Sequence, residues 1–263
     1  MNKKILLFAV LALFVVGSGS DCNDFIGERV RGSGNMDEEI RNISGVSGVK
    51  LATLGKLYIE LGLEEKLVIK AEDNLLEYLE TDVRNGVLII DTRRNINIRP
   101  RKKVSYYLTV KELESIMISS SGDIEAPDLK TDRLKFSVSS SGDLRTGELV
   151  VKSLDVNISS SGNIFIPELQ ANTIDVNISS SGDLDINRGN VEKQDVSITS
   201  SGNYQARNLE SREARVHISS SGDVYLNAED YLYVQISSSG NLYYSGNPRI
   251  DQGTSSSGRV KKR

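Results

Sequence analysis

The sequence contains no tryptophan, one cysteine, one histidine and four prolines in 263 residues. A single cysteine, Cys22, cannot form a disulfide within the chain. No zinc-binding spacing, phosphate-binding glycine loop or Ser/His/Asp set occurs. The one histidine, His217, takes a slot that Asn, Ser or Gln fills in other repeats, and we interpret it as a surface residue. These absences leave nothing that looks like a catalytic apparatus or a metal site.

Long hydrophobic runs are also absent, apart from one at the N-terminus. Lys3 and Lys4 precede a 12-residue apolar run, Ile5 to Val16, and small residues follow from Gly17 to Ser20. A membrane-spanning helix needs about 20 apolar residues, whereas this pattern is typical of a secretory signal. We therefore predict that residues 1–20 are a signal peptide and that the protein is exported to the periplasm or cell surface.

Cys22 follows this run directly, where a bacterial lipoprotein carries its acylated cysteine. The preceding residue, Asp21, is not the small residue that lipoprotein signals require. Two outcomes stay open: a lipid anchor at Cys22 to the outer membrane, or ordinary cleavage near Ser18 to Ser20. Membrane contact is expected only through such an anchor.

The charge balance is acidic. Loss of the two signal-segment lysines changes the net charge from −4 to −6, so nucleic acid is not an expected partner. One basic run, from Arg99 to Lys103, stands out from this background. It is interpreted as a solvated loop or, alternatively, as an attachment point for acidic polymers or lipid headgroups.

A four-residue motif, Ser-Ser-Ser-Gly or Thr-Ser-Ser-Gly, recurs through the second half of the chain. Its glycines are spaced by 20 residues up to the sixth and by 18 for the last two. They are Gly122, Gly142, Gly162, Gly182, Gly202, Gly222, Gly240 and Gly258. Asp or Asn follows every glycine except the last.

Each of the first seven repeats has β-branched or other apolar residues six and four positions before its glycine, with a mostly polar residue between them, as in Val176, Asn177 and Ile178. This period-2 alternation predicts a half-buried strand, and a second strand follows the glycine. A unit of this size cannot bury its own apolar face, so successive units must stack in parallel. We predict an all-β fold in which residues 116–263 form a parallel β-helix of 20-residue coils, with serine hydroxyls laddered at the corners and a polar C-terminal cap.

The segments before the repeats are less regular. Residues 21–45 are polar and are predicted to be a linker or a loosely held N-terminal segment. Residues 46–115 are predicted to be a β-rich region that forms one continuous domain, 46–263, with the repeats. Residues 56–61 and 66–70 alternate like a hairpin, and 87–90 read as a further strand. Leucines at helical spacing behind Asp73 predict one short helix within 73–81.

Several stretches resemble the head GIN domain family of autotransporter adhesins. They are Gly32-Ser-Gly-Asn35, Ile43 to Val49, Val68 to Val83, Asn85 to Ile90 and the Ser-Gly-Asp repeats. The resemblance covers nearly all of the chain beyond the signal segment. It implies a single-stranded right-handed β-helix in a Bacteroidetes-type envelope protein, often a lipoprotein and of unknown function, and it supplies no catalytic residues.

Two outward rows are candidate binding sites. The first stacks Asp155, Asp175 and Asp195 on adjacent coils, with Lys135 and Arg215 at its ends. Like charges that face each other in a sheet repel, so this row is either a solvated acidic stripe or a site for a cation such as Ca²⁺. The second row contains Phe165, Tyr225 and Tyr243, which could stack on sugar rings or simply on each other between coils.

The leading hypothesis is a non-catalytic envelope protein that presents a β-helix for adhesion to a glycan, matrix or surface protein. The alternative is a polysaccharide lyase or glycosidase that uses Asp155, Asp175, Asp195 and Arg215. An uninterrupted repeat argues against this enzyme, because solenoid enzymes usually carry long functional loops. A purely structural envelope role is the third possibility.

Overall fold

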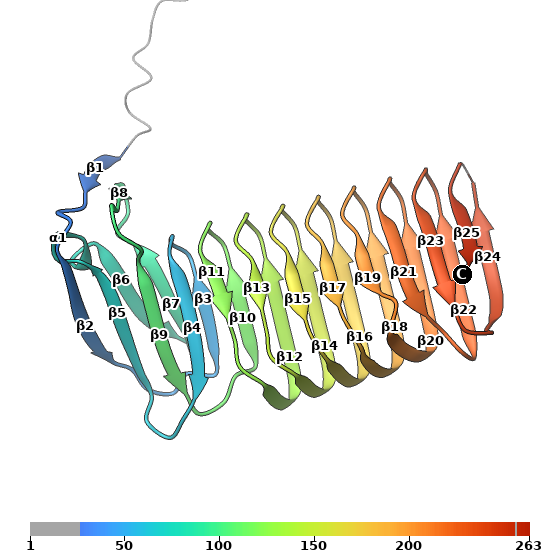
Figure 1. The fold of residues 1–263 in the computed structure, drawn as a ribbon, viewed down its shortest axis with the longest axis horizontal. Helices are drawn as coiled ribbons and strands as arrows, with labels where there is room; N and C mark the ends of the chain where they lie inside the picture. The colour runs from blue at the N-terminus through green and yellow to red at the C-terminus, as the bar shows by residue number, and fades with distance from the viewer. Residues whose placement is uncertain (1–26, 256) are drawn as a thin grey trace, which may run out of the picture.

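The computed structural model describes residues 27–255 and 257–263 of the chain. The signal segment, residues 1–20, and Cys22 lie outside the described residues. The fold is an elongated, nearly all-β solenoid whose strands stack side by side from one end to the other (Figure 1). The predicted β-helix with a β-rich N-terminal region is therefore confirmed. No helix in the described part is long and apolar enough to cross a membrane.

Two long sheets run along the solenoid. In spatial order, the first contains β24 (Arg249–Thr254), β22 (Tyr231–Ile236), β20 (Leu209–Ile218), β18 (Gly189–Ile198), β16 (Leu169–Ile178), β14 (Leu149–Ile158), β12 (Leu129–Val138), β10 (Ser115–Ile118), β3 (Gly48–Leu51), β7 (Val87–Thr92) and β6 (Leu79–Arg84). The second contains β2 (Met36–Asn42), β5 (Lys66–Glu72), β9 (Ser105–Val110), β4 (Lys56–Leu61), β11 (Asp123–Glu125), β13 (Leu144–Arg145), β15 (Ile164–Ile166), β17 (Leu184–Ile186), β19 (Tyr204–Ala206), β21 (Asp223–Asn227), β23 (Asn241–Ser245) and β25 (Arg259–Lys262). A separate pair joins β1 (Glu28–Arg31) to β8 (Ile96–Arg99) in parallel.

Each coil gives one strand to each sheet, and the 20-residue period becomes the pairing register. Val156 pairs with Val176, and Val176 with Val196, so equivalent residues stack coil on coil. Their side chains are fully buried between the sheets. At about 25 cal/mol per Å² of apolar surface, this continuous core is the main stabilising contribution, and no coil would have it alone.

The corner glycines are required by close packing between coils. A Cβ placed at Gly182 would lie 2.2 Å from the carbonyl oxygen of Gly162, and the same obstacle faces Gly142, Gly162, Gly202, Gly222 and Gly240. The backbone N–H of Gly182 donates to the Ser160 carbonyl at 2.9 Å. The predicted ladder of serine hydroxyls is not what holds the corner, because among the described residues no hydrogen bond joins two corner serine hydroxyls. Apart from one bond from the Ser139 hydroxyl to the Ile118 carbonyl, the serines contact the neighbouring coils through their backbone. The serines on either side of Ser180 are exposed.

The Asp or Asn after each glycine bonds the next coil. Its side-chain oxygen accepts the backbone N–H of the equivalent residue one coil later, as in Asp183 to Asn163 at 3.0 Å and Asn203 to Asp183 at 2.8 Å. From Asp143 onward Asp and Asn alternate, and each Asn amide also donates to the Asp before it. The sequence predicts a local backbone contact here, whereas the observed contact joins neighbouring coils.

The N-terminal region differs from its predicted form in three places. β4 and β5 do not pair as a hairpin, because β9 lies between them, parallel to β4 and antiparallel to β5. Residues 21–45 contain β1 and β2 within their described part, and β2 pairs with β5, so this segment is not simply a linker. The helix α1 covers only Asp73–Leu76, since Leu79 starts β6 and enters the core.

A buried carboxylate explains the Gly32-Ser-Gly-Asn35 motif and the basic run together. Glu72 accepts backbone N–H groups from Gly34 at 2.6 Å and Arg101 at 2.7 Å, and a Cβ on Gly32 would collide with it. Burial alone would raise the pKa of Glu72. The backbone N–H groups of Arg101, Lys102 and Gly34 stabilise the charged carboxylate, and they hold the pKa below its ordinary value. The basic run thus has a structural role: its backbone closes around Glu72.

Candidate binding surfaces

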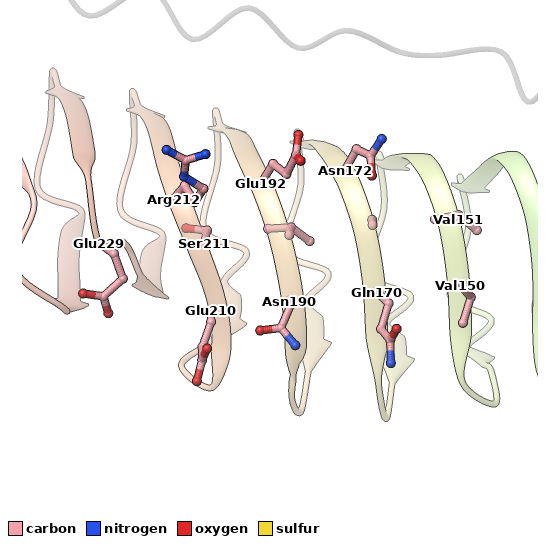
Figure 2. Close-up of a pocket in the computed structure, with 12 residues that line it drawn as sticks. Val150, Val151, Gln170, Asn172, Asn190, Glu192, Glu210, Ser211, Arg212 and Glu229 are labelled. Carbon is pink, nitrogen blue, oxygen red and sulfur yellow. The ribbon is translucent and has the colours of Figure 1, made fainter.

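A groove crosses the outer face of the first sheet, a feature that the sequence did not reveal. It is lined by residues of β14, β16, β18 and β20 and by Glu229, and its volume is about 550 Å³. Figure 2 shows the lining side chains in rows that run from coil to coil. With strands about 4.8 Å apart, the groove extends roughly 14 Å from β14 to β20. This volume falls within the range of about 300–1,000 Å³ that is common for ligand sites.

The groove lies between two outward rows. We name them the Gln170 row (Val150, Gln170, Asn190 and Glu210) and the Asn172 row (Asn172, Glu192 and Arg212). The residues between them, Val151, Ala171, Val191 and Ser211, form the central row. Neighbouring side chains on a strand point to opposite faces, and Val151 and Val191 belong to the core. The backbone of the central row therefore forms the groove floor.

The first sheet changes direction at the Asn172 row, which lines one side of the groove. Pairing between β16 and β18 runs from Leu169 to Ala171, omits Asn172 and resumes at Thr173. The alternation of buried and exposed side chains also shifts at this point. Val191 and Gln194 are both buried, although residues three positions apart on a regular strand would face opposite sides. This interruption separates the groove from the part of each strand that carries the aspartate row.

The charge of the groove is acidic at its C-terminal end. Arg212 binds Asp230 at 2.9 Å, and this hydrogen bond raises the pKa of the guanidinium. In the part of the chain that the structure describes, Glu192, Glu210 and Glu229 take part in no ion pair. The β14 and β16 end offers only apolar and amide side chains, from Val150, Gln170 and Asn172 among others.

A smaller depression continues the groove toward the N-terminal end. It is lined by Leu61, Asp128 to Lys130, Glu148 and Val150, and its volume is about 310 Å³. Val150 lines both hollows. An elongated ligand could therefore pass from one to the other along the solenoid axis.

The predicted aspartate row is present in register but lies outside the groove. Asp155 pairs with Asp175 and Asp175 with Asp195. Asn157 donates to Asp155 at 2.5 Å, and Asn177 to Asp175 at 2.8 Å. These amides orient the carboxylates along the surface of the sheet.

Burial and repulsion within the row both act on its central member, Asp175. Burial, followed by the charges of Asp195 and Asp155, raises the pKa of Asp175. Arg215 approaches Asp195 at 3.7 Å and partly compensates one end. Among residues 27–255 and 257–263, no group of three His, Cys, Asp or Glu side chains converges to hold a metal ion.

The predicted aromatic row is only partly brought together. Tyr225 and Tyr243 stack at 4.7 Å between ring centroids, nearly parallel at 10°. Arg207 lies 4.1 Å from the centre of Tyr225, and Arg263 lies 4.6 Å from that of Tyr243. The ring faces thus contact neighbours within the chain, which favours the inter-coil interpretation.

Phe165 is separate from the two tyrosines. Asp185 and Gln205 occupy the same outward row between Phe165 and Tyr225. The row continues upstream instead, where Tyr58 pairs with Tyr107 and the rings stack at 5.2 Å. Sequence reasoning missed this second pair because it precedes the repeats, although the alternation of residues 56–61 was visible.

Comparison with known proteins identifies the family. The model of the family described as "Putative auto-transporter adhesin, head GIN domain" matches residues 46–167 and 146–248. No curated protein matches the chain.

Solved structures share the fold over 90% of this chain and all of their own length. A putative adhesin from Parabacteroides merdae is 23% identical with a TM-score of 0.83. One from Parabacteroides distasonis is 22% identical with a TM-score of 0.82. A protein of the latter organism named a putative lipid binding protein is 25% identical with a TM-score of 0.76.

The family match spans well over half of the chain, and the resemblance noted in the sequence is confirmed. The protein belongs to the head GIN domain family of putative auto-transporter adhesins.

Proposed function

We propose that this protein is a non-catalytic, adhesin-type binding protein of the cell envelope, which holds an elongated ligand along the outside of its solenoid. The observation that carries the proposal is the groove, which crosses four consecutive long strands. A stack of rigidly paired coils keeps such a surface preorganised, and preorganisation lowers the entropic cost of binding. The family description is consistent with this role.

The rival function, a polysaccharide lyase or glycosidase, has less support. Glycosidases typically place two carboxyl groups on either side of the scissile bond within a substrate cleft. Here Asp155, Asp175 and Asp195 lie in one straight row, outside the groove. The 20-residue period also runs through this region without an inserted loop.

Binding and catalysis can be tested on the same material. The purified protein is applied to arrays of glycans, matrix proteins and lipids, with and without Ca²⁺, and every bound polysaccharide is then assayed for depolymerisation. Saturable binding without cleavage is the expected result. Cleavage that Asp175→Ala abolishes would replace the proposal with the enzyme, and no binding to any class would refute it.

Location is tested separately on intact cells. Brief protease treatment from outside should remove the protein if it is exposed on the surface. Metabolic labelling with a fatty acid, compared with a Cys22→Ala variant, reports whether Cys22 is acylated. A protein that stays in the cytoplasmic fraction would contradict an envelope role.

A further inference from the structure

The groove narrows the class of ligand because few backbone groups of its floor are free to pair with a ligand. An extended peptide usually binds a sheet by pairing with an open edge strand. In the central row, Val191 is already paired with Ala171 and Ser211, and only the contact between Val151 and Ala171 lacks backbone pairing. A peptide main chain would therefore find few partners here.

The two rows beside the floor instead suit a polymer with hydroxyl groups on both sides. Gln170 and Asn190 stand in the Gln170 row, with Asn172 opposite in the Asn172 row. A side-chain amide both donates and accepts hydrogen bonds, as does a sugar hydroxyl. The equivalent amides of Gln170 and Asn190 stand one coil apart, about 4.8 Å, which is close to the advance of one sugar unit in an extended glycan.

Charge restricts the glycan further. At the C-terminal end, Glu192, Glu210 and Glu229 are free of ion pairs within the described residues, while Arg212 is held by Asp230. An acidic polysaccharide would meet like charge there, whereas neutral sugars or sugars with amino groups would not.

We infer that the groove between the Gln170 row and the Asn172 row binds an extended glycan that is uncharged or bears amino groups, with the amino groups at the Glu192 and Glu210 end. This inference rests on the proposed function, since it names the ligand class of the same surface. The glycan lies along the solenoid axis, and its ring faces rest on the floor.

Three hexasaccharides test the inference by calorimetry on the full-length protein. Chitohexaose is neutral, the chitosan hexamer shares its backbone but carries amines, and hexagalacturonate is acidic. We expect the first two to bind and the third to bind at least about tenfold more weakly.

Two variants locate the site. Gln170→Ala/Asn190→Ala should weaken both bound hexamers roughly tenfold, and Glu192→Gln/Glu210→Gln should weaken only the chitosan hexamer by a similar factor. Asn177→Ala is the matched control, because Asn177 lies on the same strand as Gln170 but beyond the groove. Thermal unfolding of each variant verifies that the fold persists.

The outcomes separate the inference from the proposed function. Equal or tighter binding of hexagalacturonate, or glycan binding that the groove variants do not weaken, overturns the inference and leaves an adhesin-type role intact. The same holds if only peptides or lipids bind. If no array component binds at all, the proposed function fails together with the inference.

Discussion

At the scale of single residues, the position after each corner glycine shows how the repeat is stabilised. Asp and Asn serve equally as acceptors for the next coil's backbone N–H, but only Asn can also donate. Alternation from Asp143 onward keeps like charges from facing each other in the stack, and the amide of Asn163 reaches Asp143 at 3.0 Å. The choice between the two residue types is therefore a matter of charge rather than of backbone geometry.

The variant Asn163→Asp tests this explanation. It removes the amide donor and places four carboxylates in succession, at residues 123, 143, 163 and 183. We expect the free energy of unfolding to fall by about 1 kcal/mol at pH 7. In 1 M salt the loss should shrink, because the screening length falls to about 3 Å.

Urea unfolding at low salt and in 1 M salt measures the effect. Asn172→Asp is the control, since Asn172 is exposed on the groove rim, outside the corner stack. Equal losses in the two variants, or a loss that does not depend on salt, would contradict the role given to the alternation.

At the scale of the strand, the aspartate row lowers the stability of the native state, and the buried core of the strands compensates for the loss. The raised pKa of Asp175 means that its charged form is disfavoured in the native state relative to the unfolded chain. Such a group lowers stability at pH values above its native pKa. The penalty is relieved as the pH falls through that pKa, because the native state then binds the proton more readily than the unfolded state.

Replacing Asp175 by Asn should therefore stabilise the protein at pH 7. We expect a gain of about 0.5 kcal/mol, limited by solvent screening of this exposed row. The gain should vanish well below pH 4 and should shrink in 1 M salt, where the screening length falls to about 3 Å. Thermal unfolding across pH and salt measures it.

Asp132→Asn is the comparison, because Asp132 faces a lysine on the next coil rather than another aspartate. Asp132 accepts a hydrogen bond from Lys152 at 2.8 Å, so its replacement should leave stability unchanged or slightly lower. A similar stabilisation by both variants would indicate a general effect of net charge rather than repulsion within the row.

At the scale of the whole molecule, the solenoid is a stack of nearly equivalent units. Each coil pairs only with its two neighbours, and the 20-residue period sets the register. Stability should therefore be close to a sum over coils and their interfaces. The groove, in contrast, exists only where several coils present their long strands together.

Deletion of residues 143–162 tests this modular description. It joins Gly142 to Asn163, removes one full coil and preserves both the register and the alternation after Asp123. We expect a folded, shorter protein with a β-type circular dichroism spectrum, a cooperative transition at somewhat lower temperature, and a groove shortened by Val150 and Val151.

Deletion of residues 148–157 is the comparison, because a ten-residue loss puts strands of the two sheets out of phase. Size-exclusion chromatography and circular dichroism should show a folded first variant and an aggregated or unfolded second one. Similar behaviour of the two deletions would refute independent stacking of coils.

Several features followed from the sequence alone. Inward residues such as Val176 and Ile178 alternate with polar ones at a fixed 20-residue interval, and only parallel stacking buries all of them. The corner glycines, the aspartate row and the aromatic row could be placed for the same reason. Because the repeat sets the register, residues 20 positions apart in the sequence lie side by side on adjacent coils.

In the N-terminal region, which has no such repeat, sequence spacing does not predict which residues lie side by side. The alternation of β4 and β5 was visible, but their separation by β9 was not, because local patterns do not specify which strands pair. The interaction of Glu72 with Gly34 and Arg101 likewise joins segments far apart in the chain. Such contacts are decided by which arrangement satisfies a buried carboxylate and closes the core.

The sequence by itself determined the solenoid, its corners and its rows, since a strict period leaves one way to bury the apolar residues. Only the tertiary structure decided where the surface is hollow. The residues of the groove are unremarkable in composition, and the interruption of pairing beside Asn172 has no motif. The hollow arises where strands that each bury their inward residues change direction together, and shape of that kind depends on many coils at once.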